Sequence, residues 1–487
     1  MATIKDLKPA IVFKNFYAIT QIPRPSKHEE KMSKYLYDWG IAHKLDTSRD
    51  KSGNVIIRKA ATKGYENRKG VILQGHMDMV AAKTSDSKHN FLTDPIETVI
   101  DGDWIKTKGT TLGADNGIGV SLALAVLESD NLKHGPIEAL FTIDEEQGMT
   151  GARALSADAL KGEILLNLDE EEDGALCMGC AGGVNVTATK KYKEVTDIPE
   201  GYVTYILEAD KGEGGHSGQD ISRGRINANK SVVRILLPLV EEYGCLLSSI
   251  QGGTLRNAIP IQCKAEILVP KLTEKTVKAV VEKHIADILD EHKISDPKAE
   301  MSFKASKAGV SGYIKTNDAL KFLRALLACP NGAARMSEVI PGLTETSTNM
   351  AIVNVGKGEF FVKSLTRSSV DPAKDTLALT EEAVFKLIGC KVTMDGEYNG
   401  WKPNQDSPIL KVMKKVYKDL YGHEPKVNAT HGGLECGIFT CKYPQWDMIA
   451  FGPTLVFPHS PAEKLQISTV GRAFDFLCKT LENIPKK

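Results

Sequence analysis

Five side chains of the metal-binding type lie at the ends of apolar runs, or in the adjoining loops, of this 487-residue sequence. They are His76, Asp115, Glu146, Asp169 and His459. A mixture of imidazole and carboxylate ligands is typical of zinc, cobalt or manganese at a hydrolytic site, whereas structural zinc sites favour thiolates. A zinc ion lowers the pKa of a bound water to about 7, which makes hydroxide available at neutral pH. The set therefore predicts a hydrolytic metal centre.

Each of these residues also has an ordinary structural explanation when it is taken alone. Asp115, in the glycine-rich segment TLGADNG, is a candidate N-cap for the helix that follows it. Glu146 belongs to the acidic turn DEE, and a lone histidine such as His459 is more often structural than metal-binding. The metal interpretation therefore depends on the five side chains meeting at one place in the fold.

Two of the candidates have neighbours that extend their chemistry. Asp78 follows His76 by two residues, and a carboxylate at that position accepts the proton of the ring nitrogen that does not bind metal, which fixes the tautomer. Glu145 directly precedes Glu146 at the end of the apolar run PIEALFTI. On an extended segment these two side chains point to opposite sides, so one can bind metal while the other faces a substrate.

Three apolar runs, at residues 70–75, 136–143 and 163–168, predict the buried strands that position these groups. Residues 116–129, between the first two runs, have the pattern of a largely buried helix. Alternating strands and helices indicate an α/β layer fold, in which ligands bind at the carboxyl ends of the strands. Because His76 and the acidic candidates follow these strand ends, we expect them at one edge of a sheet.

The pattern of the sequence changes near residue 187 and changes back near residue 395. Further strand and helix patterns lie between these positions, without a second cluster of acids and histidines. The remaining residues return to the first style, with a strand at 446–451 ahead of His459. We predict an α/β fold with a discontinuous catalytic domain, whose mixed and mainly parallel sheet is flanked by helices, and an inserted α+β lid domain. The catalytic domain would comprise residues 1–186 and 396–487, and the lid residues 187–395.

Composition argues against several classes of protein. Lys+Arg and Asp+Glu both count 62, so a zero formal net charge predicts no attraction to nucleic acid or to an anionic membrane. The sequence shows no signal peptide and no run of about eighteen apolar residues, so we expect no membrane span. The nine scattered cysteines fit reduced thiols in a cytoplasm. We interpret the lone C-x-x-C pair, Cys177 and Cys180, as part of a strand, because a single pair is a weak metal or redox signal.

A series of short motifs runs in order along the chain. They are GHMDMV, TLGADNGIGV, DEEQGMTGA, NLDEEEDG, GGHSGQDI, GGTLRNAIP, TETSTNMAIV, SLTRSSVD, HGGLECGIF and FPHSPAEKLQI. From about residue 10 to the C-terminus the series resembles the zinc carboxypeptidase/aminoacylase family of co-catalytic metallopeptidases, and its late motifs resemble the bacterial aminoacyl-histidine (Xaa-His) dipeptidase branch. The resemblance implies two zinc ions, with cobalt or manganese as substitutes. His76, Asp115 and Asp169 would hold one metal, and Asp115, Glu146 and His459 the other.

The resemblance also implies roles for residues that do not bind metal. Glu145 would be the general base, and Asp78 would orient the histidine before it. Three lid residues would contact the substrate: His216 at the oxyanion, Asn257 as a further polar contact, and Arg367 at the C-terminal carboxylate, which suits a guanidinium fork. From the sequence alone, Arg367 is equally well explained by a surface salt bridge, and Asn257 by a turn.

These observations predict a cytoplasmic metallo-dipeptidase that acts on unblocked dipeptides, including Xaa-His and β-alanyl-histidine. The alternatives are an N-acyl-amino-acid amidohydrolase with the same metal pair, and a non-catalytic binder that kept the scaffold. A serine hydrolase is disfavoured, because the segment GHSGQ around Ser217 does not match the G-x-S-x-G elbow. Small dipeptides are the expected partners, and a homodimer formed through the lid is a further possibility.

Overall fold

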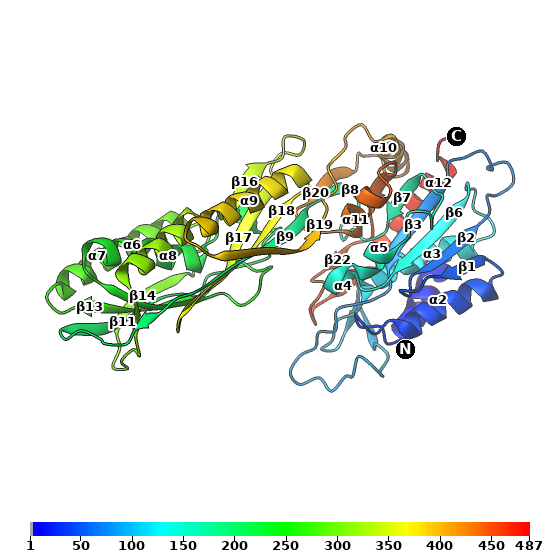
Figure 1. Ribbon diagram of the computed structural model, residues 1–487. Coiled ribbons are helices and arrows are strands. Elements are labelled where there is room, and N and C mark those ends of the chain that lie inside the picture. Colours follow the sequence, from blue (N-terminus) through cyan, green and yellow to red (C-terminus); the bar gives the residue numbers. More distant parts are fainter. Residues whose placement is uncertain (1–2) are drawn as a thin grey trace. The chain divides into compact units, whose positions relative to one another are not determined.

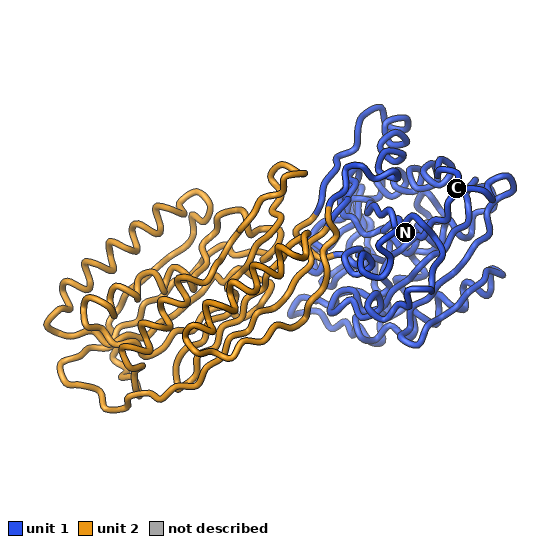
Figure 2. Tube along the Cα trace, turned by 45° about the horizontal axis from the view of Figure 1, so that its top comes forward, with its two compact units in different colours: residues 1–179, 403–429, 434–487 blue, residues 180–402, 430–433 orange. Residues whose placement is uncertain are grey.

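The computed structural model describes residues 3–487 (Figure 1). The chain divides into two compact units (Figure 2). Unit 1 comprises Met1–Gly179, Pro403–Ala429 and Leu434–Lys487, and unit 2 comprises Cys180–Lys402 and Thr430–Gly433. Unit 1 is therefore discontinuous in sequence, with unit 2 inserted between its parts.

Unit 1 contains an eight-stranded mixed sheet. Its strand order is β1 (Asp46–Arg49), β2 (Val55–Lys59), β6 (Ile137–Thr142), β3 (Val71–His76), β7 (Ile164–Asn167), β21 (Asp447–Ala450), β8 (Ala175–Cys180) and β20 (Lys426–Thr430). The four central strands, β6, β3, β7 and β21, are parallel. The pairs β1–β2, β2–β6 and β21–β8 are antiparallel. The prediction of an α/β fold with a mixed, mainly parallel sheet flanked by helices is confirmed.

The apolar runs of the sequence form the centre of this sheet. Every residue of β3, β6 and β7 is buried, as expected for parallel strands that are covered on both faces. Cys177 and Cys180 are buried in β8, in agreement with their interpretation as strand residues. The helix α3 (Ala114–Glu128), which is apolar nearly all round, packs against β3 and against α1 (Ala10–Thr20).

The remaining helices of unit 1 come from both ends of the chain. They are α2 (Glu30–Ala42), α4 (Glu145–Gly148), α5 (Thr150–Ala154), α10 (Pro408–Tyr421), α11 (Glu435–Lys442) and α12 (Ile467–Glu482), with the 3-10 turn η1 (Ile4–Asp6). Among residues 3–487, every helix is too short or too polar to cross a lipid bilayer.

A second, four-stranded sheet in unit 1 fixes the loop that carries His459. Its strand order is β22 (Leu455–Val456), β23 (Lys464–Gln466), β5 (Trp104–Thr107) and β4 (Thr98–Asp101). Strands β22 and β23 pair with each other and enclose residues 457–463, while β23 pairs with β5 from the N-terminal part of the chain. The loop that carries His459 is thereby attached to β5, which comes from the N-terminal part of the chain.

Unit 2 is built on an antiparallel sheet of nine strands. They follow the order β14 (Glu300–Ala305), β11 (Tyr202–Asp210), β13 (Cys263–Pro270), β12 (Leu246–Gly252), β17 (Thr344–Gly356), β18 (Glu359–Ser368), β9 (Gly182–Lys191) and β19 (Lys391–Tyr398), with β16 (Gly332–Met336) also paired to β17. Four helices pack on one face of this sheet (Figure 1): α6 (Ala228–Glu242), α7 (Glu274–His292), α8 (Thr316–Ala328) and α9 (Asp371–Leu387). Two short strands, β10 (Glu194–Val195) and β15 (Tyr313–Ile314), pair separately, and η2 (Ile221–Arg223) is a 3-10 turn.

The boundaries between the two units differ from the positions expected from the sequence. The expected changes at 186/187 and 395/396 fall inside β9 and β19, which are both strands of the unit 2 sheet. Cutting there would separate residues that pair within one sheet, so the compact unit includes both strands entirely. The unit 2 segment Thr430–Gly433 carries no sequence signal of a boundary.

Candidate metal centre

Four of the five candidate ligands lie at the carboxyl edge of the central sheet or beside it. His76 is the last residue of β3, Glu146 lies in α4 directly after β6, and Asp169 comes two residues after β7. Asp115 lies at the start of α3, where its own backbone is extended (φ −77°, ψ 110°), after Gly113, whose φ of 69° glycine adopts at little cost. Parallel strands present their carboxyl ends together, and this brings the residues to one place.

The ring of His76 is flanked by three carboxylates. Its Nε2 is 3.0 Å from Oδ1 of Asp115 and 3.6 Å from Oδ1 of Asp169. Its Nδ1 is 3.2 Å from Oδ1 of Asp78. Because the Asp78 carboxylate accepts the Nδ1 proton, Nε2 is the ring nitrogen that faces the two other acids, and its lone pair would be available to a cation bound there.

The second oxygen of Asp115 faces the C-terminal histidine. Nε2 of His459 is 3.0 Å from Oδ2 of Asp115 and 2.9 Å from Oε2 of Glu146. His76, Asp115 and Asp169 thus form one group of candidate ligands, and Asp115, Glu146 and His459 form another, so Asp115 belongs to both. The structure thus brings all five predicted residues together. The two oxygens of Asp115 contact two different histidines. An N-cap role for Asp115 does not explain these contacts.

The geometry and the donor types fit two divalent cations. Ligands about 2.0–2.2 Å from a tetrahedral zinc lie roughly 3.3 Å from one another, close to the separations between the imidazole nitrogens and the carboxylate oxygens. Burial raises the pKa of Asp169 to about 6 and that of Glu146 to about 7, and repulsion from the Asp115 carboxylate acts in the same direction on both. Oε1 of Glu146 is buried without a hydrogen-bond partner in the described chain. Bound cations would satisfy this oxygen and offset the repulsion.

Asp78 connects the histidine to the glutamate pair. Besides the ring of His76, its carboxylate accepts the backbone N–H of Glu145 at 3.0 Å, the backbone N–H of Glu146 at 3.3 Å and the hydroxyl of Ser26 at 2.8 Å. Burial acts to raise the pKa of Asp78, but the hydrogen bonds and the nearby imidazole outweigh it and hold the pKa below its ordinary value. One buried carboxylate therefore positions both the metal-binding face and the adjoining turn.

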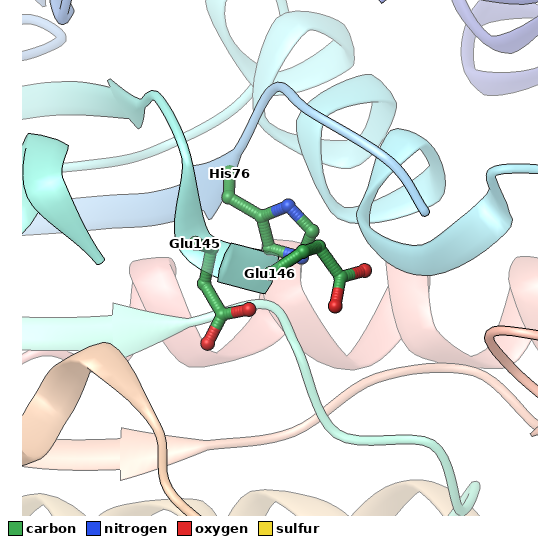
Figure 3. A group of neighbouring side chains, drawn as sticks. All are labelled: His76, Glu145 and Glu146. Atoms are coloured by element: carbon green, nitrogen blue, oxygen red, sulfur yellow. The ribbon is translucent and has the colours of Figure 1, made fainter. Parts of the chain in front are cut away.

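The expected extended geometry at the glutamate pair is wrong. Glu145 and Glu146 begin the single helical turn α4, after Asp144 at a φ of 54°. Figure 3 shows the two carboxylates pointing in different directions, with Glu146 near the His76 ring. Successive side chains on a helical turn point about 100° apart. This divergence, and not the alternation of side chains along a strand, allows Glu145 and Glu146 to have different roles. Burial raises the pKa of Glu145 well above its ordinary value.

The left-handed residue before this pair is held by its own set of contacts. Asp144 forms an ion pair with Lys27, accepts the hydroxyl of Thr150 at 2.5 Å, and donates its backbone N–H to Glu29 at 3.1 Å. A non-glycine residue at positive φ costs free energy, so contacts of this kind are needed to maintain it.

Glu463 is a site residue that the sequence reasoning missed. Its buried carboxylate accepts four consecutive backbone N–H groups of the loop that carries Asp115: those of Leu112 at 2.7 Å, Gly113 at 3.0 Å, Ala114 at 2.8 Å and Asp115 itself at 3.2 Å. Burial raises the pKa of Glu463 to about 7 in spite of these bonds. The available signal was its position four residues after His459 in the motif FPHSPAE.

Arg24 is a second missed residue and is 1% exposed. Its guanidinium donates to the carbonyls of Met77 at 3.0 Å and Asp78 at 2.7 Å, and also to the carbonyl of Gly113. It therefore ties the end of β3 to the loop before α3. Burial lowers the pKa of Arg24 to about 10, so the side chain stays charged at neutral pH. The segment PRPS around it has no recognisable motif.

The three residues expected to contact substrate lie together in unit 2. Nε2 of His216 is 3.4 Å from Nη2 of Arg367, and Nη1 of Arg367 donates to the hydroxyl of Tyr398 at 2.9 Å. Asn257 is exposed, and its carbonyl accepts the backbone N–H of Ser217 at 2.8 Å. The guanidinium of Arg367 is buried, so the surface salt-bridge explanation of this arginine is wrong.

Comparisons with known proteins agree with this geometry. The chain is 40% identical over 487 residues, the full length of both chains, to the cytosol non-specific dipeptidase of Escherichia coli strain K12. Its fold matches the crystal structure of aminoacylhistidine dipeptidase from Vibrio alginolyticus with a TM-score of 0.92 and 42% identity, covering 100% of this chain and 99% of that one. The aminopeptidase PepT of Bacillus cereus shares the fold, with a TM-score of 0.57 and 14% identity over 98% of this chain and 99% of that one.

The family model described as peptidase family M20/M25/M40 matches residues 72–483, which include every candidate ligand. With this match and a full-length relative at 40% identity, the chain belongs to that peptidase family.

Proposed function

We propose that this protein is a metal-dependent dipeptidase with two divalent cations, of which zinc is the preferred ion and cobalt or manganese are substitutes. His76, Asp115 and Asp169 would hold one cation, and Asp115, Glu146 and His459 the other. The observation that carries the proposal is the division of the Asp115 carboxylate, whose two oxygens each lie 3.0 Å from Nε2 of a different histidine. A bridging carboxylate of this kind is suited to a pair of cations.

The proposed reaction is hydrolysis of one peptide bond. When bound, the cations would supply Lewis acidity for the scissile carbonyl and would make an attacking water more acidic. Glu145 takes the proton from this water and passes it to the leaving amine. Its carboxylate is oriented by α4, whose first backbone N–H groups are held by Asp78.

The names of the relatives support short peptides as substrates. The Escherichia coli relative is named for non-specific dipeptidase activity, and the Vibrio alginolyticus relative for aminoacylhistidine dipeptidase activity. We therefore propose unblocked dipeptides as substrates, with Xaa-His and β-alanyl-histidine among them. Unit 2 serves as the lid domain in this proposal. His216 contacts the oxyanion, Asn257 adds a polar contact, and Arg367 binds the terminal carboxylate.

Removal and restoration of metal test the proposal. The purified protein should hydrolyse alanyl-histidine and β-alanyl-histidine, lose this activity after dialysis against a chelator, and regain it when zinc is added back to two equivalents. N-acetyl-histidine provides the comparison for an N-acyl-amino-acid amidohydrolase. Hydrolysis of N-acetyl-histidine in the absence of dipeptide hydrolysis would refute the dipeptidase assignment.

Two further properties belong to the same proposal. The name of the Escherichia coli relative supports a cytoplasmic location, which a fluorescent fusion or cell fractionation would check. A homodimer formed through unit 2 stays a prediction, and size-exclusion chromatography with light scattering would give the mass of the assembly.

A further inference from the structure

The guanidinium of Arg367 is buried in unit 2 without an acidic partner. The residue is 4% exposed, and no carboxylate among residues 3–487 forms an ion pair with it. Its Nη1 donates to the hydroxyl of Tyr398, and its Nε has no hydrogen-bond partner in the described chain. Because a buried charge is costly unless it is paired, this arrangement indicates an anion that the chain itself does not supply.

A second polar side chain in the same part of unit 2 also has an unused nitrogen. His431 is 4% exposed and belongs to unit 2 through the short segment Thr430–Gly433. Its Nε2 lies 2.7 Å from the hydroxyl of Ser347, whereas its buried Nδ1 has no partner in the described chain. Buried polar atoms in folded proteins are rarely left without a hydrogen bond, so Nδ1 calls for a ligand or a water.

The pairing of β17 with β18 places Ser347, the hydrogen-bond partner of His431, beside Arg367. Ser347 on β17 is directly opposite Arg367 on β18, and directly opposed residues project their side chains on the same face, with Cβ atoms about 5 Å apart. The ring of His431, which is bonded to Ser347, therefore lies on the face of the sheet that carries the guanidinium. Arg367 and His216 contribute to the electrostatic environment of His431.

The contacts of His431 indicate which nitrogen carries its proton. Burial, assisted by the charge of Arg367, lowers the pKa of His431 to about 3, so the ring is neutral at physiological pH. When the hydroxyl of Ser347 donates its proton to Nε2 of His431, that proton has an acceptor, and the ring carries its own N–H on Nδ1. The opposite tautomer would leave the buried hydroxyl proton of Ser347 without an acceptor. The first arrangement makes Nδ1–H a fixed donor.

The loop between His216 and Gln219 is shaped to accept His431. A side chain at Gly218 would place its Cβ 2.4 Å from the carbonyl oxygen of His431, so only glycine allows the two segments to approach this closely. In the same loop, Nδ1 of His216 accepts the backbone N–H of Gln219 at 3.1 Å. Nε2 of the same ring lies 3.4 Å from Nη2 of Arg367.

We infer that His431 is a specificity-determining residue that, together with Arg367, binds the terminal carboxylate of the substrate. The guanidinium supplies charge and one N–H donor, and Nδ1–H of His431 supplies a neutral donor to the other oxygen. Ser347 positions the ring. The inference rests on the proposed dipeptidase function. It adds His431 as the residue that distinguishes a substrate with a free C-terminal carboxylate from one whose C-terminus is an amide. A fully charged second donor would be costly next to the guanidinium, which explains why a neutral imidazole is used here.

The test compares a free C-terminus with a blocked one in the full-length, zinc-loaded protein. Steady-state kcat/KM is measured for alanyl-histidine and for its C-terminal amide in the wild type, His431→Ala and His431→Asn. For His431→Ala we expect kcat/KM on the free dipeptide to fall about tenfold to a hundredfold, mainly through KM, with a much smaller loss on the amide. His431→Asn, whose amide nitrogen occupies nearly the position of Nδ1, should recover most of the preference for the free carboxylate.

His423→Ala, at an exposed histidine outside these contacts, is the matched control and should leave both substrates unaffected. Binding of free histidine and of histidinamide, measured by calorimetry in the same variants, gives a readout that does not require turnover. A wild-type protein that binds histidine no better than histidinamide overturns the inference, even if dipeptides are hydrolysed. Equal losses on the free and the blocked dipeptide in His431→Ala, without rescue in His431→Asn, also overturn it, since they indicate a purely structural role. If no dipeptide is hydrolysed, the proposed function fails, and the calorimetric comparison alone decides the role of His431.

Discussion

The carboxylate of Glu463 accepts the backbone N–H of Asp115 at 3.2 Å, and thereby joins the C-terminal loop of unit 1 to the residue shared by both ligand groups. The same carboxylate accepts the three preceding N–H groups of the loop. Glu463 lies four residues after His459, so one side chain sets the distance between the loop of the bridging acid and the loop of the last histidine.

Replacement of Glu463 by glutamine should weaken metal binding. The amide keeps one acceptor oxygen but directs an NH₂ group at N–H donors, so the loop can no longer be held at four points. We expect zinc affinity to fall about tenfold to a hundredfold, as is usual when a partner that orients a ligand is lost. Competition titration with a chromogenic chelator measures this. Glu66→Gln is the control, because Glu66 also accepts a backbone N–H, that of Gly64, but at the surface. Similar affinities in the two variants would show that Glu463 does not position Asp115.

Substitutions at the two adjacent glutamates should affect catalysis and metal binding differently. Glu145→Gln removes the proposed base and leaves all five ligands in place, so kcat should fall by about 10²–10⁴-fold with two zinc ions retained. Glu146→Gln removes a ligand and should lower both the metal content and the activity. Elemental analysis combined with turnover of alanyl-histidine distinguishes the two cases. Full activity in Glu145→Gln would exclude this residue as the base.

Arg24 should contribute strongly to stability. Replacement by methionine keeps much of the side-chain volume but leaves the buried carbonyls of Met77 and Asp78 without their donor, whereas the carbonyl of Gly113 still accepts the backbone N–H of Gly117. Removing one partner of a buried hydrogen bond costs about 1–3 kcal/mol for each group left unsatisfied. Urea denaturation should therefore show a loss of at least about 2 kcal/mol in the free energy of unfolding. The exposed Arg49 in β1 offers the control substitution, Arg49→Met, which should have little effect.

The stability of unit 2 should depend on pH through Glu381. This buried carboxyl accepts hydroxyl protons from Thr348 at 2.7 Å and Thr366 at 2.5 Å, and burial raises its pKa above the ordinary value. A raised folded-state pKa means that the folded chain binds the proton more tightly, so the stabilisation is complete below the unfolded pKa and is lost as the pH rises through the folded pKa. We expect the free energy of unfolding of unit 2 to decrease over that interval.

Glu381→Gln should remove this part of the pH dependence, because the amide is neutral throughout. Urea midpoints of the full-length protein, measured at a series of pH values above 4.5, the ordinary pKa of a glutamate, provide the measurement. Glu242→Gln, at an exposed position of α6, serves for comparison and should keep the wild-type profile. Parallel profiles for the Glu381 and Glu242 variants would contradict the expectation.

The central part of the fold could be predicted because its apolar runs are long and buried. The strand expected at 70–75 is β3 at Val71–His76, and the helix expected at 116–129 is α3 at Ala114–Glu128. The positions of the ligands followed from the same runs, since a strand end is visible in sequence. The local geometry at Glu145 was not visible, because the positive φ of Asp144 depends on Lys27 and Glu29, which are distant in sequence.

The residues that support the site were harder to recognise than the ligands. Arg24 acts through backbone carbonyls and Glu463 through backbone N–H groups, and such contacts impose no spacing on the side chains that make them. His431 lies in a segment between two elements of unit 1, yet its contacts are in unit 2. Only the three-dimensional structure places these residues.

The insertion of unit 2 ahead of His459 has a consequence for synthesis of the protein. Domains generally fold as units while the chain emerges from the ribosome, and unit 2 is complete, except for Thr430–Gly433, once residue 402 has been made. At that stage unit 1 still lacks β21, the fourth parallel strand, and the loop that carries the last histidine. The nascent polypeptide therefore has only one of the two ligand groups, and cannot act as a peptidase until its final segment is translated and docks onto the older part of the chain.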